Sequence, residues 1–424
     1  MSSANRQYDL VVWGATGVAG RLVADYLTEQ YTPEELSVCL GGRNEERLRA
    51  VEADAVDEAD SWDDIPLILG DATDPERLRA IASQTRVICS TVGPYTEYGT
   101  PLVEACIEAG TDYCDLTGEV NWVREMIDRF HERATNRGAR IIHSCGFDSI
   151  PADLGTLLVQ SHAIREFGGP CDVVQIYLED GNGSFSGGTL ASAAALFEAA
   201  STDPRAREAL SNPYSLAPVE ERHGPDSGAQ RRPQRASLRS GWTAPSPMAV
   251  VNERVVRRSN ALLNYPWGRD FRCTEVIPTG DGPGGAAAAG AVAAGLGAVF
   301  AGLARAPVRS AMQRYLFPDP GEGPSKAETK EGHFTVRVLG RGMAANGPFT
   351  VESQIGADLD PGYGATSRML SESAMALVTG DTDSPFSGGV LTPASGIGGP
   401  LASRLRDAGL TAEVSTVPES DDLA

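Results

Sequence analysis

Residues 8–27 read YDLVVWGATGVAGRLVADYL. The apolar run at 8–13 is short enough for a buried parallel strand, and the apolar residues of 21–27 recur at helical spacing. Between them stand Gly14, Gly17 and Gly20, spaced three apart. Such glycines let the backbone approach a diphosphate closely, and the N–H groups and dipole of the following helix favour its charge. The stretch predicts a strand, a glycine turn and a helix that bind a dinucleotide.

Arg43 indicates which dinucleotide this is. A second strand at 36–40 is followed by two glycines and Arg43, where an NAD enzyme would place an acidic residue against the ribose hydroxyls. An arginine at that point accommodates the 2′-phosphate of NADP(H). The alternative is a solvated arginine that binds nothing. The pattern favours NADP(H).

Strands at 66–69 and 87–92, with a helix at 100–109 and a closing strand at 139–143, extend the alternation of strand and helix. This order predicts an α/β fold with a Rossmann-like, doubly wound parallel sheet over 6–150. Ligands lie beyond the carboxyl ends of such strands, so Asp71 is expected near the adenine and 91–94 near the nicotinamide ribose. The alternatives are a loop cap at Asp71 and a plain turn at Gly93-Pro94. The predicted cofactor residues are Gly14, Thr16, Gly17, Gly20, Arg43, Asp71, Thr91, Val92, Gly93 and Pro94.

The character of the sequence changes beyond Pro151. Residues 151–363 predict a mixed α+β substrate domain, with a surface excursion near 212–247 that is rich in proline, arginine and polar residues. Residues 364–412 predict helices that pack back on the first domain. The elements expected within these ranges are strands at 173–178, 333–338 and 349–355 and helices at 189–200, 365–379 and 396–408.

Net charge is the unusual feature of the composition. The 424 residues carry 36 basic and 57 acidic side chains, a net charge of −21, and Lys326 and Lys330 are the only lysines. An acidic surface that is poor in lysine suits a protein dissolved in multimolar salt, where screening removes like-charge repulsion. We therefore expect a saline cytoplasm, with a merely acidic protein as the alternative. A nucleic-acid binder would need a basic face and is not expected.

The cysteines and the N-terminus also indicate the cytoplasm. The seven cysteines form no C-x-x-C pair and no zinc spacing, and several lie in apolar strand-like runs, as buried free thiols do. The five histidines are scattered singly, so no metal site is predicted. Residues 1–7 are polar and lack the apolar region of a signal peptide.

Residues 286–304 contain no charge and are long enough to cross a bilayer, although most of them are alanine and glycine. Their larger residues fall on one helical face, so a buried or docking helix, a helix that faces a membrane, and a true span are the alternatives. We expect a peripheral contact at most, not an integral membrane protein.

Several runs resemble the saccharopine dehydrogenase-like oxidoreductases, and among them the trans-acting enoyl reductases of mycobacterial lipid synthesis. The similar runs are 14–20, 91–99 (TVGPYTEYG), 112–119 (DYCDLTGE), 145–151 (CGFDSIP), 185–189 (FSGGT), 257–263 (RRSNALL) and 389–393 (GVLTP). The resemblance covers nearly the whole chain. It implies a nicotinamide-dependent reductase of a lipid-like or polyketide-derived chain, with association at a membrane.

Reduction of an activated double bond needs a hydride from NADPH and a protein group that polarises a carbonyl and delivers a proton. The predicted donors are Tyr95, Tyr98 and Asp148, because each lies in a run expected to border the cofactor. Structural roles are the alternatives: Tyr95 packing against a ring, and Asp148 capping a helix that begins near Ile150. No Tyr-x-x-x-Lys pair is present, which argues against the short-chain dehydrogenase mechanism.

Two other functions stay open. A saccharopine-type amino-acid dehydrogenase would need arginines that clamp carboxylates, and Arg254, Arg257 and Arg258 are the dense candidates. A non-catalytic protein would bind NADP(H) and organise a lipid surface. The sequence does not identify the substrate or the oligomeric state, although a homo-oligomer fits this class.

Overall fold

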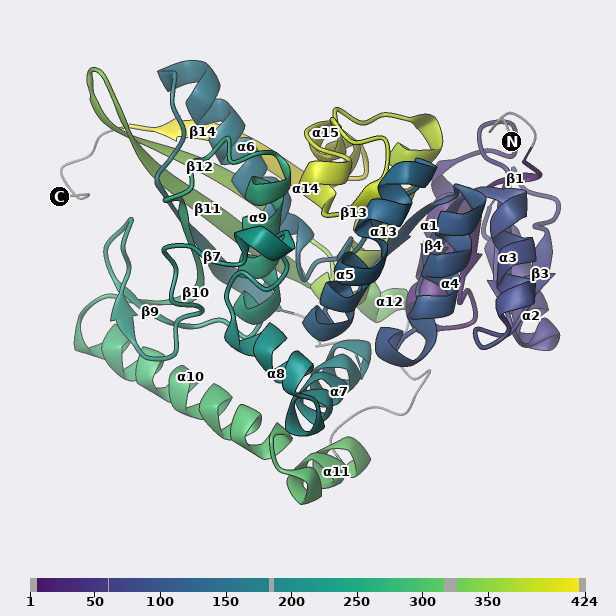
Figure 1. Ribbon diagram of the computed structural model, residues 1–424, viewed down its shortest axis with the longest axis horizontal. Coiled ribbons are helices and arrows are strands. Elements are labelled where there is room, and N and C mark those ends of the chain that lie inside the picture. Colours follow the sequence, from purple (N-terminus) through teal and green to yellow (C-terminus); the bar gives the residue numbers. More distant parts are fainter. Residues whose placement is uncertain (1–5, 60, 183–186, 316–325, 419–424) are drawn as a thin grey trace.

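Alternation of strand and helix over the first 142 residues produces six strands of a parallel sheet, whose full order with β13 (Gly389–Leu391) is β13-β6-β5-β4-β1-β2-β3. The computed structural model describes residues 6–59, 61–182, 187–315 and 326–418 (Figure 1). Its first elements are β1 (Tyr8–Trp13), α1 (Val18–Gln30), β2 (Val38–Gly42), α2 (Glu45–Asp57), β3 (Leu67–Leu69), α3 (Pro75–Gln84), β4 (Thr85–Ser90), α4 (Tyr95–Ala109), β5 (Asp112–Asp115), α5 (Val120–Arg137) and β6 (Arg140–Ile142). The predicted Rossmann-like fold is confirmed.

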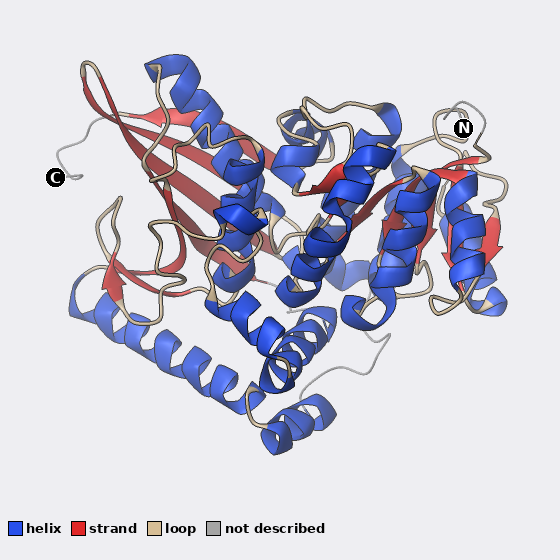
Figure 2. Cartoon of the chain, in the orientation of Figure 1, coloured by secondary structure: helices blue, strands red, loops and turns tan. Residues whose placement is uncertain are grey.

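Both faces of this sheet are covered by helices (Figure 2). Successive residues of β1 point to opposite faces, so Leu10 and Val12 pack in the core beside α1 and α2, while Val11 and Trp13 pack beside α3 and α4. Burial on both faces explains why β1 reads as a continuous apolar run. The seven cysteines are all buried and free, as expected.

A strand from the far end of the chain extends the first sheet. β13 (Gly389–Leu391) pairs in parallel with β6, so the prediction that 139–143 closes the sheet was wrong. Three residues that pair with a strand some 250 positions earlier carry no local periodicity, and the pairing could not be recognised from the sequence. Residues 364–412 therefore contribute a strand to the first domain as well as helices.

The second sheet is mixed and has the order β14-β12-β11-β7-β10-β9-β8. Its strands are β7 (Val173–Asn182), β8 (Gln234–Arg235), β9 (Trp242–Pro245), β10 (Arg272–Gly280), β11 (His333–Ala344), β12 (Gly347–Ala357) and β14 (Thr411–Val417). β11 and β12 form the predicted antiparallel pair. α6 (Ile150–Phe167) packs on these two strands and α9 (Ala249–Leu262) packs on α6. Figure 1 shows the two sheets at opposite ends of the molecule.

The excursion at 212–247 is not only a surface segment, because β9 within it joins the second sheet. The remaining helices are α7 (Gly187–Thr202), α8 (Pro204–Ser211), η2 (Val219–Glu221), α10 (Gly282–Leu303), α11 (Ala306–Tyr315), α12 (Lys326–Thr329), η3 (Pro361–Ala365), α13 (Thr366–Thr379), α14 (Pro393–Gly396) and α15 (Pro400–Asp407). Among the described helices, α10 alone is long and apolar enough to cross a membrane. Few of its residues are buried, so it is not a core helix.

α4 begins at Tyr95, five residues before the predicted start. The structure caps α4 from a distance: the Glu119 carboxylate accepts hydrogen bonds from the backbone N–H groups of Tyr95 (2.9 Å) and Thr96 (2.8 Å). A cap supplied from 23 residues away leaves no local signal, and this explains the error.

The Glu372 carboxylate joins the C-terminal segment to the first domain. It lies on α13, is almost fully buried, and accepts hydrogen bonds from Tyr26 Oη (2.7 Å) and Tyr31 Oη (2.8 Å) of the first domain. Arg404 of α15 donates its Nε to the same carboxylate at 2.9 Å. Burial, with the charge of Glu372, raises the pKa of both tyrosines, so their hydroxyls stay protonated as donors.

We expect Glu372→Ala to lower the free energy of unfolding by about 3 kcal/mol, because it leaves a largely buried arginine and two hydroxyls without their shared acceptor. Urea unfolding at fixed salt measures the effect. Glu45→Ala is the control. Glu45 pairs with Arg49 on the exposed surface of α2, and this ion pair should contribute about 0.5 kcal/mol or less to the free energy of unfolding. Equal effects of the two substitutions would contradict a structural role for this network.

Candidate functional site

The glycine turn between β1 and α1 is built for close approach of the backbone. Gly14 has a φ of +94°, and a Cβ there would lie 2.7 Å from Thr91 Oγ1 and from Val92 Cγ2. A Cβ at Gly20 would lie 2.2 Å from the carbonyl oxygen of Gly14. Both positions therefore require glycine. The turn fits the backbone cradle that a dinucleotide diphosphate needs.

The N-terminus of α1 is left open to an anion. Its N-cap is Gly17, which has no side chain to cap the helix, and its first turn contains no acidic residue. By contrast, Asn44 caps α2 and Asp74 caps α3 with side-chain oxygens. Thr16 lies in the turn just before this N-terminus and is partly exposed. The free N–H groups and the helix dipole suit a phosphate.

Arg43 and Asp71 follow β2 and β3 at the same edge of the sheet. Arg43 is exposed and forms no hydrogen bond or ion pair with any described residue, so its guanidinium is available to a 2′-phosphate. Asp71 accepts hydrogen bonds from the Thr73 hydroxyl (2.7 Å) and backbone N–H (2.8 Å). These bonds, and then the nearby Arg43, lower the pKa of Asp71. The loop-cap role accounts for this geometry, and contact with the adenine stays a prediction.

The turn between β4 and α4 lies directly against the glycine turn. Thr91 Oγ1 donates to the carbonyl oxygen of Gly14 at 3.1 Å, and Val92 is in contact range of the same glycine. Gly93 and Pro94 complete this turn, and Pro94 is the N-cap of α4. Two of the predicted cofactor segments, 14–20 and 91–94, are therefore in contact at the carboxyl edge of the sheet.

The three predicted proton donors have different surroundings. Tyr95 is buried in the core, with its ring 5.4 Å from Trp122 and its hydroxyl donating to the carbonyl oxygen of Ser90 at 3.0 Å. Burial raises its pKa well above the usual range. These contacts give Tyr95 a structural role. Tyr98 is partly exposed on α4, and its hydroxyl forms no hydrogen bond with a described residue.

Asp148 lies in the turn between β6 and α6. It does not cap α6, whose N-cap is Ser149 without a side-chain hydrogen bond to the helix. The Asp148 carboxyl is partly buried and has no hydrogen-bond partner among the described residues. Burial raises its pKa to about 6. A carboxyl with this pKa keeps its proton up to about pH 6, higher than an exposed aspartate does, and it makes no hydrogen bond with a described residue that would stabilise the fold.

Glu275 of β10 lines the same small cavity as Asp148, and sequence reasoning missed it. Its carboxylate accepts hydrogen bonds from Ser246 Oγ (2.5 Å) and Asn252 Nδ2 (2.6 Å). Burial raises the pKa of Glu275 to about 7; the two hydrogen bonds lower it, and the charges of Glu253 and then Asp148 raise it by smaller amounts. An acidic residue in an otherwise alternating strand, Cys273-Thr274-Glu275-Val276, was the one available signal.

The cavity encloses about 20 Å³, room for one water-sized group. Its walls come from both domains and are apolar apart from Asp148, Asn252 and Glu275; the other lining residues are Phe147, Pro151, Ala152, Ile176, Leu178, Met248 and Val336. No basic side chain is among them. The cavity therefore has a mainly apolar wall that carries two carboxyls with raised pKa values.

Asp115 and His143, also missed from the sequence, support the turns that carry these groups. His143 Nδ1 donates to Asp115 at 2.7 Å, and the other Asp115 oxygen accepts from the backbone N–H groups of Thr117 (3.1 Å) and Ser144 (3.2 Å). Both residues are buried at the ends of neighbouring strands. Asp115 therefore ties the turn after β5 to the turn after β6.

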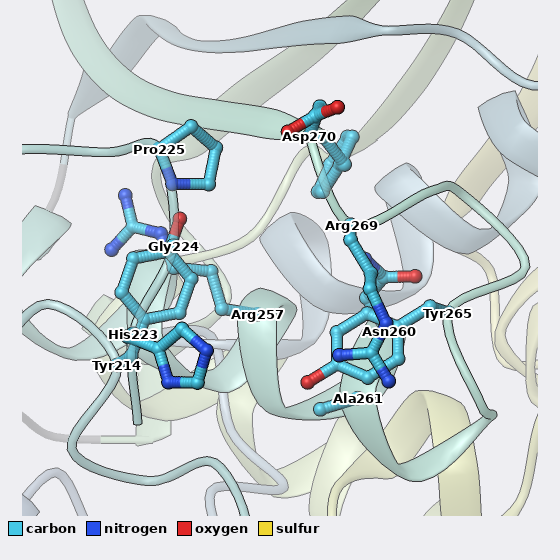
Figure 3. A pocket seen from close by; sticks show the side chains of 11 residues that line it. Tyr214, His223, Gly224, Pro225, Arg257, Asn260, Ala261, Tyr265, Arg269 and Asp270 are labelled. Atoms are coloured by element: carbon cyan, nitrogen blue, oxygen red, sulfur yellow. The ribbon is translucent and has the colours of Figure 1, made fainter. Parts of the chain in front are cut away.

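A larger pocket of about 400 Å³ is lined by residues of the second domain (Figure 3). Tyr214, His223 and Pro225 of the excursion form one side and Tyr265 and Arg269 the other. All of its lining residues fall between 214 and 271, so the first domain contributes none. Its two arginines already have partners within the fold. Arg269 pairs with Glu221, and Arg257 pairs with Glu253 and Asp226.

The arginines expected to clamp a carboxylate substrate are used by the fold. Arg257 forms ion pairs with Glu253 (2.9 Å) and Asp226 (2.8 Å). Arg254 donates to the backbone carbonyls of 210, 212 and 250, and Arg258 to those of 216 and 390. All three are buried. They do not form a carboxylate clamp.

Comparison with known proteins agrees with this geometry. Residues 10–142 match the family model of the saccharopine dehydrogenase NADP binding domain. A Mycobacterium tuberculosis protein that carries the name of a trans-acting enoyl reductase is 39% identical over 98% of this chain and 99% of its own. A trans-acting enoyl reductase of Mycobacterium ulcerans is 36% identical over 97% of this chain and 98% of its own. The chain belongs to the saccharopine dehydrogenase-like family of oxidoreductases.

A solved structure shares the fold. The saccharopine dehydrogenase (L-Glu forming) of Saccharomyces cerevisiae has a TM-score of 0.54 and 15% identity, and the match covers 97% of this chain and 100% of that one. The saccharopine dehydrogenase-like chain described here is an NADP-dependent oxidoreductase. The predicted family, fold and cofactor are confirmed.

We expect Arg43→Ala to weaken NADPH binding by about 1.5–3 kcal/mol, roughly tenfold or more, and to leave NADH binding unchanged, because only NADPH carries the 2′-phosphate. Titration of nucleotide fluorescence measures both affinities. Arg49→Ala on the exposed face of α2 is the control for loss of a nearby positive charge. Equal losses for NADPH and NADH would show that Arg43 does not recognise the 2′-phosphate.

Proposed function

We propose that this oxidoreductase uses NADPH to reduce an enoyl or keto group on a neutral, lipid-like acyl chain. The observation that carries the proposal is the small cavity shared by Asp148 and Glu275, which is apolar apart from these carboxyls and Asn252 and has no basic side chain; at about 20 Å³ it would take the reacting group of a substrate and not its chain. A neutral group suits this wall, whereas a charged amino acid would lack a counter-ion there. The printed names of the mycobacterial relatives, trans-acting enoyl reductases, favour the enoyl group.

The glycine turn, Arg43 and the turn at 91–94 would hold the cofactor, which supplies a hydride when it is bound. The chain itself must supply the proton. Asp148 is the donor we favour, because its carboxyl faces the cavity without a hydrogen-bond partner and has a pKa of about 6. Glu275, with a pKa of about 7, lies in the same cavity. Two carboxyls in one apolar cavity do not both ionise readily, so the pair keeps a proton near neutral pH.

Tyr98 is the second candidate donor, since its hydroxyl is partly exposed and has no described partner. The saccharopine-type dehydrogenase is disfavoured, because Arg254, Arg257 and Arg258 are bound within the fold. A non-catalytic scaffold would bind NADPH without turnover, so a single oxidation of NADPH by an acyl acceptor excludes it.

The proposed enzyme works in a saline cytoplasm and contacts a membrane. The excess of acidic residues supports work in a saline cytoplasm. The exposure of α10 supports a peripheral contact of residues 286–304 with a membrane, from which a lipid-like substrate would come.

We expect Asp148→Asn to lower kcat for trans-2-dodecenoyl-N-acetylcysteamine by roughly 10²–10⁴-fold, because the amide has no acidic proton to give. NADPH affinity should stay within twofold or so, since Asp148 is not among the groups expected to hold the cofactor. Tyr98→Phe is the matched variant for the second donor. If Tyr98→Phe shows the large loss and Asp148→Asn does not, the donor is Tyr98.

The pH profile gives an independent test. A required protonated carboxyl is present below its pKa and lost above it, so kcat/KM of the wild type should fall as pH rises past about 6 to 7. Asp148→Asn should remove this decline from its residual activity. A wild-type profile that stays flat across this range would contradict a carboxyl donor.

A further inference from the structure

Two long runs of this acidic chain carry arginines without any acidic residue. The two longest stretches without an acidic residue are 227–252 and 282–318, and together they contain seven arginines. In a protein with a net charge of −21, both runs are net positive. The first contains β8 and β9, and the second contains α10 and α11.

These two runs meet in space. α10 packs against β9 and β10, and β8 pairs with β9. Figure 1 shows α10 along the edge of the molecule, with β9 beside its first turns and α11 beyond its end. We call the surface made by α10 with Arg231, Arg232, Arg235 and Arg305 the basic–apolar face.

The arginines of this face are available to an external anion. Arg231, Arg232, Arg235 and Arg305 are exposed, and none of them forms an ion pair with a described residue. The Arg235 guanidinium lies 4.8 Å from the centre of the Trp242 ring, and Arg305 bonds only to a carbonyl of its own helix. Four unpaired arginines are notable in a chain whose other arginines mostly have carboxylate or carbonyl partners.

The helix itself leaves apolar surface in water. No residue from 282 to 304 is charged, and only Gly285, Ala289 and Leu303 of α10 are buried. Val299 is 42% exposed, and so is Val308 on α11. Contiguous apolar surface of this length marks a binding surface. At 1.5 Å per residue, its 22 residues extend about 33 Å.

The packing of α10 fixes its orientation. Its first turns are held by β9 and β10 and its last turns by α7 and α11, where the Phe300 and Phe197 rings lie 5.5 Å apart. A helix attached at both ends along the protein surface cannot cross a bilayer without being pulled from these contacts. It can lie in the plane of the interface with its exposed side towards lipid.

We propose that the basic–apolar face docks on the surface of an anionic lipid bilayer, with α10 parallel to the membrane plane. The apolar side of α10 would enter the acyl boundary, and the four arginines would contact anionic headgroups. A second copy of the chain is the weaker occupant, because a twofold interface through this face would set arginines against arginines. The inference extends the peripheral contact proposed above and does not depend on the reaction catalysed.

The test is flotation of the full-length protein with vesicles of equal parts phosphatidylglycerol and phosphatidylcholine, compared with phosphatidylcholine alone. Salt is held at the lowest concentration at which unfolding stays cooperative, because screening weakens headgroup attraction. We expect binding to the anionic vesicles and at least tenfold weaker binding to the neutral ones. Equal binding to both, or none to either, overturns the proposal.

Two variants test the apolar part and the basic part of the basic–apolar face separately. Val299→Asp/Val308→Asp places charges at two apolar positions of α10 and α11 that are each 42% exposed, and it should reduce vesicle binding at least tenfold. Arg231→Gln/Arg232→Gln/Arg235→Gln should reduce binding to anionic vesicles by on the order of a hundredfold, at roughly fivefold per arginine. Met343→Asp is the matched control, because Met343 is an exposed apolar residue (66%) on β11, away from this face.

Light scattering and NADPH titration complete the design. Unchanged NADPH affinity shows that each variant is folded, and turnover of a water-soluble thioester reports the reaction separately from the docking. A wild-type dimer that Val299→Asp/Val308→Asp dissociates, without vesicle binding, would make a second copy the occupant and overturn the proposal. Loss of vesicle binding in Met343→Asp would overturn it too.

Discussion

The close approach of the backbone at Gly14 to the turn after β4 is the constraint on which the rest of the site depends. There is no room for a side chain at Gly14 or Gly20, and Thr91 Oγ1 bonds to the Gly14 carbonyl. This contact fixes the end of β1, the start of α1 and the end of β4 relative to one another. The uncapped N-terminus of α1 and the turn at 91–94 consequently border one space at the carboxyl edge of the sheet.

The second half of the site depends on the return of the chain to the first domain. Asp153 of α6 accepts hydrogen bonds from Ser259 Oγ of α9 (2.5 Å) and from the backbone N–H of Ala394 in α14 (2.8 Å). β13 and α13 attach the same C-terminal segment to the first sheet. Asn252 of α9 joins the elements that carry Asp148 and Glu275, because it accepts a hydrogen bond from Ser149 Oγ (2.9 Å) and donates one to Glu275 (2.6 Å). A cavity made between these elements keeps its geometry only while both attachments hold.

The sequence predicted what is local and missed what is distant. The first strand, turn and helix follow from twenty consecutive residues, and Arg43 follows from its place after the second strand. The start of α4 depends on Glu119, and the edge of the sheet depends on residues 389–391, so neither could be read from its own neighbourhood. Glu275 was missed because its meeting with Asp148 exists only after the two domains pack. Likewise, the composition of 286–304 gave a helix but not its exposure, which is set by its neighbours.

Asp153 and Asp148 both have raised pKa values, but they differ in the hydrogen bonds that their carboxyls make. A carboxyl whose pKa is raised in the folded state keeps its proton longer than in the unfolded chain, so it destabilises the fold as pH rises from about 4 towards its folded pKa. Asp153, with a pKa of about 7, offsets that cost because its hydrogen bonds join three helices. Asp148 has a raised pKa as well but no hydrogen bond to a described residue. The raised pKa of Asp148 therefore lowers the stability of the fold without a hydrogen bond that offsets the effect. A protonated carboxyl at the wall of an apolar cavity is the proton donor that a reductase would need.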